Sequence, residues 1–162
     1  MRNLVYHEFP PEYHKNDTVL ILGSIPSPKS REEQFYYAHP QNRFWRVLAE
    51  IFKEKLPSTI EEKKEFLKKY HIALWDVIYS CEIEKASDTS IKNVTPNNIN
   101  LILEKCPIEK IFTVGKTATK LYKKYCYPNT KIESIYLPST SPANCAIKME
   151  QLIKEFEKII TK

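Results

Sequence analysis

The chain alternates short apolar blocks with longer stretches in which apolar residues recur every three or four positions. Short, continuous blocks rich in β-branched or aromatic residues are typical of buried strands; they span 18–23, 71–78, 110–115 and 131–137. The stretches between them predict helices over about 40–56, 60–70, 96–106 and 116–125, and a final helix that begins at Ser141.

Strands that alternate with helices favour a parallel sheet covered on both faces. We therefore expect one three-layer α/β/α domain over residues 1–162, with a central, mainly parallel four-stranded sheet. Local signals support single elements. Asn42 is well placed as an N-cap, Thr59 precedes Glu62 by the spacing of a capping box, and Pro96 stands at the tolerated first position of a helix.

Two glycines are the only ones in the chain, and each ends a predicted strand: Gly23 and Gly115. In open parallel sheets ligands bind beyond the carboxyl ends of strands, where backbone must approach them closely. We expect both glycines at such a site, together with Asp76 at the end of another strand. The alternative is that each glycine only makes a tight strand-to-helix turn.

Composition and charge narrow the class of protein. The 42% hydrophobic and 28% charged residues are an ordinary globular balance. No apolar run approaches the roughly 20 residues of a membrane span, and the N-terminus is unlike a secretory signal, so a cytoplasmic protein is expected. Residues 110–132 hold six lysines and no acid, which suits contact with phosphates; the alternative is the solvated side of a helix.

Several kinds of site find no support. The four cysteines form no CxxC pair, so we expect buried free thiols and no metal site. GxGxxG and Walker A motifs are absent, which argues against a nucleotide cofactor, and no cofactor is expected. Ser24 and His39 lack the context of a serine hydrolase. Asp88 is a weak candidate for binding water or a base, and His7 and His14 are expected on the surface.

The richest segment joins the GSIPSP string at 23–28 to FYYAHPQNRFW at 35–45, which holds five of the nineteen aromatic residues. A site that handles a nucleobase needs an aromatic face, amides or hydroxyls for the base edge, and cations for phosphates. Tyr36 and Tyr37 are adjacent and cannot both point into the core, so one is available for a ligand. At least one of Phe44 and Trp45 is expected in the core of the following helix.

These strings, with LPSTSPAN at 137–144, resemble the uracil-DNA glycosylase superfamily, above all its hypoxanthine-DNA glycosylase branch and its mismatch-specific branch. The resemblance implies that Tyr37 stacks on an extruded base and that Gly23, Ser24, Ile25, Pro26 and Ser27 surround it. The mismatch-specific branch has a catalytic Asn where this chain has Ile25. In the hypoxanthine branch the Asn of HPxN serves instead, which implies Asn42 as the catalytic residue.

The resemblance also implies a DNA-contacting surface and a partner. The second loop would press the DNA backbone, and basic residues would meet phosphates; the expected DNA-binding residues are His39, Arg43, Lys116, Pro138, Ser139, Thr140, Ser141 and Asn144. The expected partner is double-stranded DNA that contains a deaminated base, bound by a monomer. The implied activity is hydrolysis of the N-glycosidic bond of hypoxanthine, with uracil or xanthine as further substrates.

The sequence is compatible with three roles for Asn42. Its amide could stabilise the charge that gathers on the leaving base, it could orient the attacking water, or it could only cap a helix. A non-catalytic nucleic-acid or nucleotide-binding module on the same fold is the alternative function, because a fold does not dictate an activity.

Overall fold

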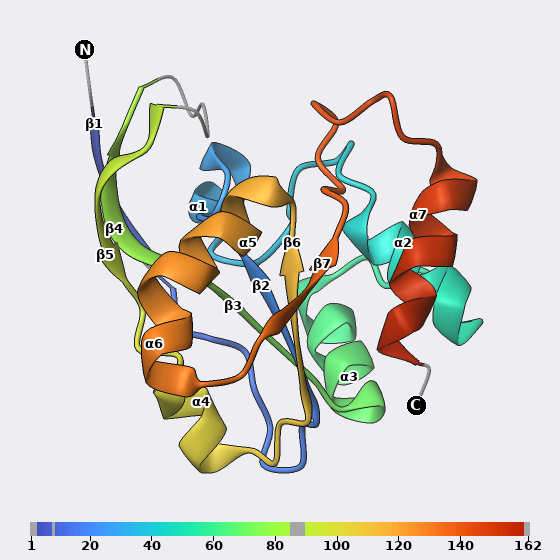
Figure 1. Ribbon diagram of the computed structural model, residues 1–162. Coiled ribbons are helices and arrows are strands. Elements are labelled where there is room, and N and C mark those ends of the chain that lie inside the picture. Colours follow the sequence, from blue (N-terminus) through green and yellow to red (C-terminus); the bar gives the residue numbers. More distant parts are fainter. Residues whose placement is uncertain (1–2, 8, 85–89, 161–162) are drawn as a thin grey trace.

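A four-stranded parallel sheet forms the centre of the molecule (Figure 1). The computed structural model describes residues 3–7, 9–84 and 90–160, so Asp88 lies outside the described residues. The strands are β2 (Val19–Gly23), β3 (Ile72–Asp76), β6 (Lys110–Val114) and β7 (Ser134–Leu137), in the order β3-β2-β6-β7. All four expected strands are confirmed, and each is shorter than the apolar block that predicted it.

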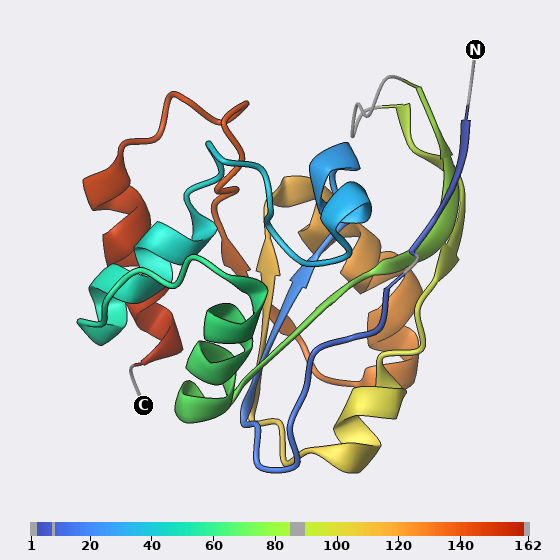
Figure 2. The same ribbon diagram turned by 180° about the vertical axis from the view of Figure 1, so that it is seen from behind.

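Helices cover both faces of this sheet, so the three-layer α/β/α prediction is confirmed. On one face, in front in Figure 1, lie α5 (Lys116–Leu121), a π-helical segment (Tyr122–Cys126) and α6 (Tyr127–Thr130). On the other face, in front in Figure 2, lies α3 (Ile60–Tyr70). The capping box predicted for α3 is present between Thr59 and Glu62.

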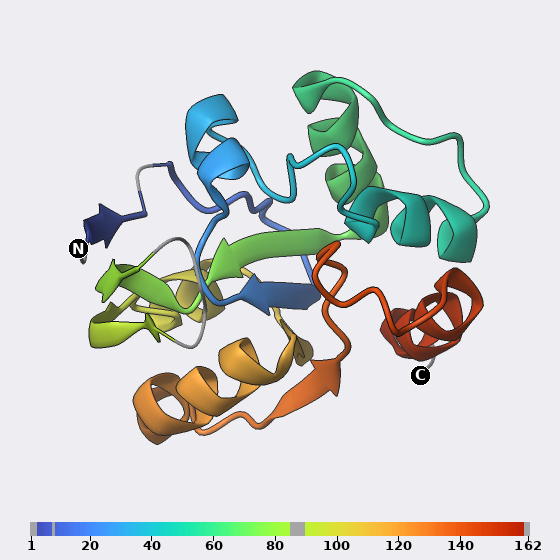
Figure 3. The ribbon, with the colours of Figure 1, turned by 90° about the horizontal axis from the view of Figure 1, so that it is seen from above.

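Two further helices pack against each other beside the sheet. They are α2 (Phe44–Phe52) and α7 (Met149–Phe156), which continues into a 3-10 turn (Glu157–Ile159). Figures 1 and 3 both show them side by side, and the rings of Phe44 and Phe156 meet edge to face with centroids 6.3 Å apart. Phe44 and Trp45 are both buried, which meets the expectation that at least one is a core residue.

A second sheet was not expected from the sequence. It is antiparallel, in the order β1-β4-β5, and consists of β1 (Asn3–Tyr6), β4 (Ile78–Ile83) and β5 (Lys92–Pro96). β5 has no fully buried residue, so it lacks the apolar alternation that marks a strand. The apolar block 71–78 contains the whole of β3 and the first residue of β4.

Three helix starts were wrong. The helix expected over about 40–56 begins at Phe44, and its N-cap is Arg43 rather than Asn42. Pro96 ends β5 instead of opening a helix, and α4 (Asn100–Lys105) begins four residues later. The final helix begins at Met149 and not at Ser141, because residues 141–148 form a loop that other segments hold. Pro28, in contrast, begins a short helix that was not predicted, α1 (Pro28–Glu33), capped by Ser27.

The sheet topology places a ligand site at one end of the molecule. β2 has β3 on one side and β6 on the other, so the strand order reverses between β2 and β6. Ligands of open α/β sheets bind at such a switch point, beyond the carboxyl ends of the strands. Gly23 and Gly115 flank this point. It lies at the end that Figure 3 views from above.

The cysteines follow the expectation with one exception. Cys81, Cys106 and Cys126 are buried, and burial raises the pKa of the Cys126 thiol to about 11. Cys145 is exposed, so the prediction of a buried thiol was wrong there. In the described part of the chain no group of three His, Cys, Asp or Glu side chains could hold a metal ion. None of the helices described here has the length and apolarity that a membrane span requires.

Candidate active site

A cleft with a volume of about 660 Å³ opens at the carboxyl ends of the parallel strands. Gly23 comes from the end of β2, Asp76 from the end of β3, Val114 from the end of β6, and Ser139 from the loop after β7. The volume lies in the range of small-molecule sites. All four strands of the sheet therefore contribute to one pocket.

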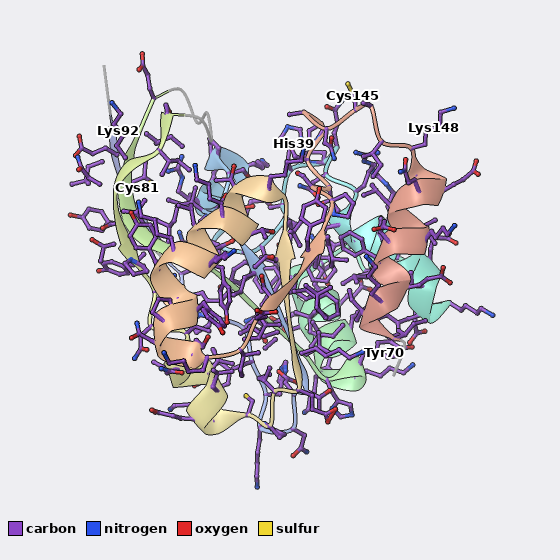
Figure 4. All side chains as sticks on the ribbon, in the orientation of Figure 1. His39, Tyr70, Cys81, Lys92, Cys145 and Lys148 are labelled. Carbon is purple, nitrogen blue, oxygen red and sulfur yellow. The ribbon has the colours of Figure 1, made fainter. Side chains whose placement is uncertain are left out.

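The cleft gathers most of the residues expected at the site. All eight expected base-binding residues line it: Gly23, Ser24, Ile25, Pro26, Ser27, Tyr37, Asp76 and Gly115. Asn42 lines it as well, as do six of the expected DNA-binding residues: His39, Lys116, Ser139, Thr140, Ser141 and Asn144. Arg43 and Pro138 are not among the lining residues. Figure 4 shows His39 and Cys145, one from each loop, at this end of the molecule.

Position 23 requires a glycine because the side chains of Asp76 and Tyr37 lie next to it. Gly23 and Asp76 are partners in the parallel register of β2 and β3. A methyl group on Gly23 would lie 2.5 Å from Asp76 Oδ1 and 3.3 Å from the Tyr37 hydroxyl. Gly115 is required by its backbone instead, because its φ of 93° lies in a region that L side chains rarely adopt.

Asn42 is held so that its amide nitrogen remains available. Its Oδ1 accepts hydrogen bonds from the Phe44 backbone N–H at 2.9 Å and from the Thr140 hydroxyl at 2.7 Å. A backbone N–H only donates, so the atom facing it is the oxygen and not the nitrogen. Nδ2 makes no hydrogen bond to any residue that the structure describes. Asn42 thus supports the start of α2 and also presents an N–H₂ donor at the cleft.

The loop after β7 is fastened to the segment that carries Asn42. The Arg43 guanidinium donates to the carbonyl oxygens of Ile147 at 2.7 Å and Asn144 at 3.0 Å, and its backbone N–H donates to Thr140 O at 3.1 Å. These bonds give Arg43 a structural role, and they explain why residues 141–148 are not helical. Thr140 is buried and its hydroxyl donates to Asn42, so this hydroxyl is not exposed to a large ligand.

Tyr36 and Tyr37 both line the cleft, but their hydroxyl groups have different surroundings. Tyr36 is buried, and its hydroxyl donates to Pro10 O at 2.9 Å. Tyr37 has a φ of 54°, which is unusual for a bulky residue and turns its side chain to the cleft. One face of its ring stacks on Phe44, with centroids 3.8 Å apart. Only the opposite face can therefore stack on a base.

The Tyr37 hydroxyl is buried and has no hydrogen-bond partner among the described residues. Burial, and secondarily the charge of Asp76, raise the pKa of Tyr37 well above its ordinary value. The group therefore stays protonated at neutral pH. Unsatisfied buried polar groups are rare in folded proteins and call for an explanation such as a missing ligand or water.

The Tyr36 hydroxyl has a hydrogen-bond partner, and the Tyr37 hydroxyl has none among the described residues. Replacing each tyrosine by phenylalanine is therefore expected to change the free energy of unfolding in opposite directions. Tyr37→Phe is expected to raise the free energy of unfolding by about 1 kcal/mol, because it removes a buried polar group that no described residue pairs. Tyr36→Phe is expected to lower it by about 1 kcal/mol, because it leaves Pro10 O without its donor. Urea unfolding measures both changes. An equal loss of stability in the two variants would contradict a free Tyr37 hydroxyl.

His7 is buried, with 7% of its surface exposed, so its expected place on the surface was wrong. Its Nε2 lies 2.8 Å from Asp76 Oδ2, and its Nδ1 lies 2.8 Å from Phe9 O. The residue follows β1, a strand of the unexpected sheet, and no local sequence signal pointed to it. His14 is half-buried between Glu12 and Asp17.

Some cleft residues were also missed, and most of the lysines expected to meet phosphates do not line the cleft. Arg31 of α1 and Tyr136 of β7 both line the cleft. The exposed lysines between β6 and β7 are Lys116, Lys120, Lys123, Lys124 and Lys131. None of the ion pairs seen between described residues involves them. They are therefore available to phosphates.

A sequence model of the Uracil DNA glycosylase superfamily matches residues 10–161, and the chain belongs to that superfamily. Together with the relatives described below, this match identifies a DNA glycosylase, whose substrate is DNA. The two-loop resemblance noted in the sequence is confirmed.

Relatives in two Methanosarcina species are similar over most of the chain. A hypoxanthine DNA glycosylase of Methanosarcina barkeri is 38% identical over 104 residues, which cover 64% of this chain and 66% of that protein. One from Methanosarcina acetivorans is 32% identical over 142 residues, or 87% and 89% of the two chains. A solution NMR structure from M. acetivorans, described as a candidate uracil DNA glycosylase, has a TM-score of 0.79 at 30% identity and covers 94% of this chain and 97% of that one.

Proposed function

We propose that the enzyme removes hypoxanthine from double-stranded DNA, with uracil and xanthine as further substrates, and that it acts as a monomer. The observation that carries the proposal is the convergence of the Tyr37 ring, the Asn42 amide and the Asp76 carboxyl in one cleft. This set supplies an aromatic face, a donor and an acceptor, which are the groups that a flipped base requires. Relatives named as hypoxanthine DNA glycosylases support the choice of base.

The hydrogen bonds of Asn42 favour one of the two catalytic roles considered for it. Both lone pairs of Oδ1 are occupied by Phe44 N–H and the Thr140 hydroxyl. The side chain therefore has no free acceptor with which to take a proton from the attacking water or to orient the lone pair of that water. The Nδ2 donor suits a leaving base, on which negative charge develops as the bond to C1′ breaks.

Cleavage then proceeds through an oxocarbenium-like sugar, as in glycoside hydrolysis generally. The N-glycosidic bond breaks, water adds to C1′, and the base leaves with the proton that water loses. Lys116 is the only lysine among the described residues that line the cleft, and it is exposed to solvent. We therefore propose hydrolysis without strand cleavage.

A panel of duplexes tests the proposal. Each duplex carries hypoxanthine, uracil, xanthine or a G·T mismatch at the same position, and alkali-labile ends are scored against time. We expect hypoxanthine to be released fastest, and no nick at the lesion without alkali. Spontaneous nicking would contradict a purely hydrolytic enzyme. Binding to the hypoxanthine duplex without release of the base would favour a non-catalytic module.

A further inference from the structure

The contact between His7 and Asp76 determines which groups can bind at the floor of the cleft (Gly23, Asp76 and the Tyr37 hydroxyl). Both side chains are nearly inaccessible, with 1% and 6% of their surfaces exposed, and His7 Nε2 lies 2.8 Å from Asp76 Oδ2. The other carboxyl oxygen, Oδ1, lies beside Gly23, and no described residue donates a hydrogen bond to it. Asp76 thus uses one oxygen for His7 and keeps the other for the cleft.

The protons of this pair can be counted. His7 Nδ1 faces the carbonyl oxygen of Phe9 at 2.8 Å, and a carbonyl oxygen only accepts, so Nδ1 carries a proton. The proton between Nε2 and Oδ2 sits either on the ring or on the carboxyl. In both arrangements Oδ1 carries lone pairs alone. His7 therefore prevents Asp76 from turning an O–H into the cleft.

We propose that His7 is a positioning residue that makes Asp76 an acceptor-only reader of a ring N–H on the flipped base. Deamination changes this feature of adenine and of cytosine. Adenine has a lone pair at N1 and hypoxanthine has N1–H; cytosine has a lone pair at N3 and uracil has N3–H. Asp76 Oδ1 can accept a hydrogen bond from N1–H of hypoxanthine or N3–H of uracil. Against adenine or cytosine, a lone pair of Oδ1 would face a lone pair of the base, and the two would repel. This inference rests on the proposed function and assigns to Asp76 the discrimination of hypoxanthine from adenine and of uracil from cytosine.

The surroundings of the pair agree with a fixed reader. The His7 ring packs against Phe9 and Tyr36, with centroids 4.6 and 5.9 Å away, so it cannot swing out of its place. Asn97 Nδ2 donates to the backbone oxygen of Asp76 at 2.8 Å. The buried Tyr37 hydroxyl, close to Gly23, is a second polar group of the floor that lacks a partner.

The test compares two duplexes under single-turnover conditions. One carries hypoxanthine, and the other carries unsubstituted purine, which has a lone pair at N1 and no N1–H. His7→Leu is expected to lower the ratio of the two release rates by about 10- to 100-fold relative to wild type, the effect of one hydrogen bond to a charged or buried group. His7→Gln, which can place an amide N–H near Asp76, should keep the ratio within about threefold. His14→Leu serves as the matched control, since His14 lies outside the cleft.

An unchanged ratio in a folded, active His7→Leu protein would overturn the proposal, because a merely structural histidine would slow both substrates alike. If His7→Leu does not fold, Asp76→Val decides: it removes the acceptor, so the ratio should fall, and an unchanged ratio overturns the proposal. Wild-type enzyme that releases neither base would overturn the proposed function itself, and this inference with it.

Discussion

Asn42→Asp is expected to slow hypoxanthine release by about 100- to 1,000-fold and to leave the fold intact. Aspartate keeps an oxygen for Phe44 N–H and for the Thr140 hydroxyl, so the start of α2 and the link between the two loops survive. The variant lacks the Nδ2 donor and sets a carboxylate against a base that leaves with negative charge. Single-turnover release from a hypoxanthine duplex measures the loss, and thermal unfolding measures the fold.

Asn98→Asp provides a matched control, because it makes the same chemical change at an exposed position that does not line the cleft. Its release rate should stay within about twofold of wild type, since isolated surface substitutions have small effects. Asn42→Ala should lose both functions of the side chain, with about 1 kcal/mol less stability in addition to the slow release. Release by Asn42→Asp at the wild-type rate would remove the amide donor from the mechanism.

Gly23→Ala is expected to reduce release by about 100-fold, the cost of displacing a site by around 1 Å. The added methyl would lie 2.5 Å from Asp76 Oδ1, and Asp76 cannot move away cheaply because His7 holds its other oxygen. Overpacking should also lower the free energy of unfolding by about 1–3 kcal/mol. In an Asp76→Ala background the stability cost of the same change should be smaller, and a double-mutant cycle measures this coupling. Additive costs would show that the clash is not with Asp76.

The central sheet could be predicted chiefly from β2, β3 and β6, which are buried on both faces, whereas the edge strand β7 is partly exposed. Every residue of β2 and β3 is buried, which makes them continuous apolar blocks in the sequence. The small antiparallel sheet lacks this signal. Its strands are partly exposed, and β4 follows β3 after a single residue, so one apolar block conceals two elements. The loop at 141–148 reads as a helix start, and only Arg43, about 100 residues away in the chain, shows why it is not one.

The cleft was predictable where its residues form local strings. Gly23 to Ser27, Tyr37 and Asn42 belong to one segment, and the second loop is another string, so the sequence alone placed them together. The role of His7 could not be predicted from the sequence, because it depends on contact with Asp76, which is 69 positions away in the chain. The structural role of Arg43 was hidden in the same way. A cation in a sequence suggests phosphate, whereas its bonds to Ile147 and Asn144 appear only in three dimensions.

A crystal structure with a hypoxanthine duplex would test the account most directly. A 2′-fluorine on the damaged nucleotide withdraws electrons from the sugar and slows an oxocarbenium-like step, so the uncleaved complex can be trapped. We expect the hypoxanthine outside the helix and in the cleft, with Asn42 Nδ2 and Asp76 Oδ1 within hydrogen-bond distance of it. A base that remains stacked in the duplex, or that is bound away from these two atoms, would contradict the account.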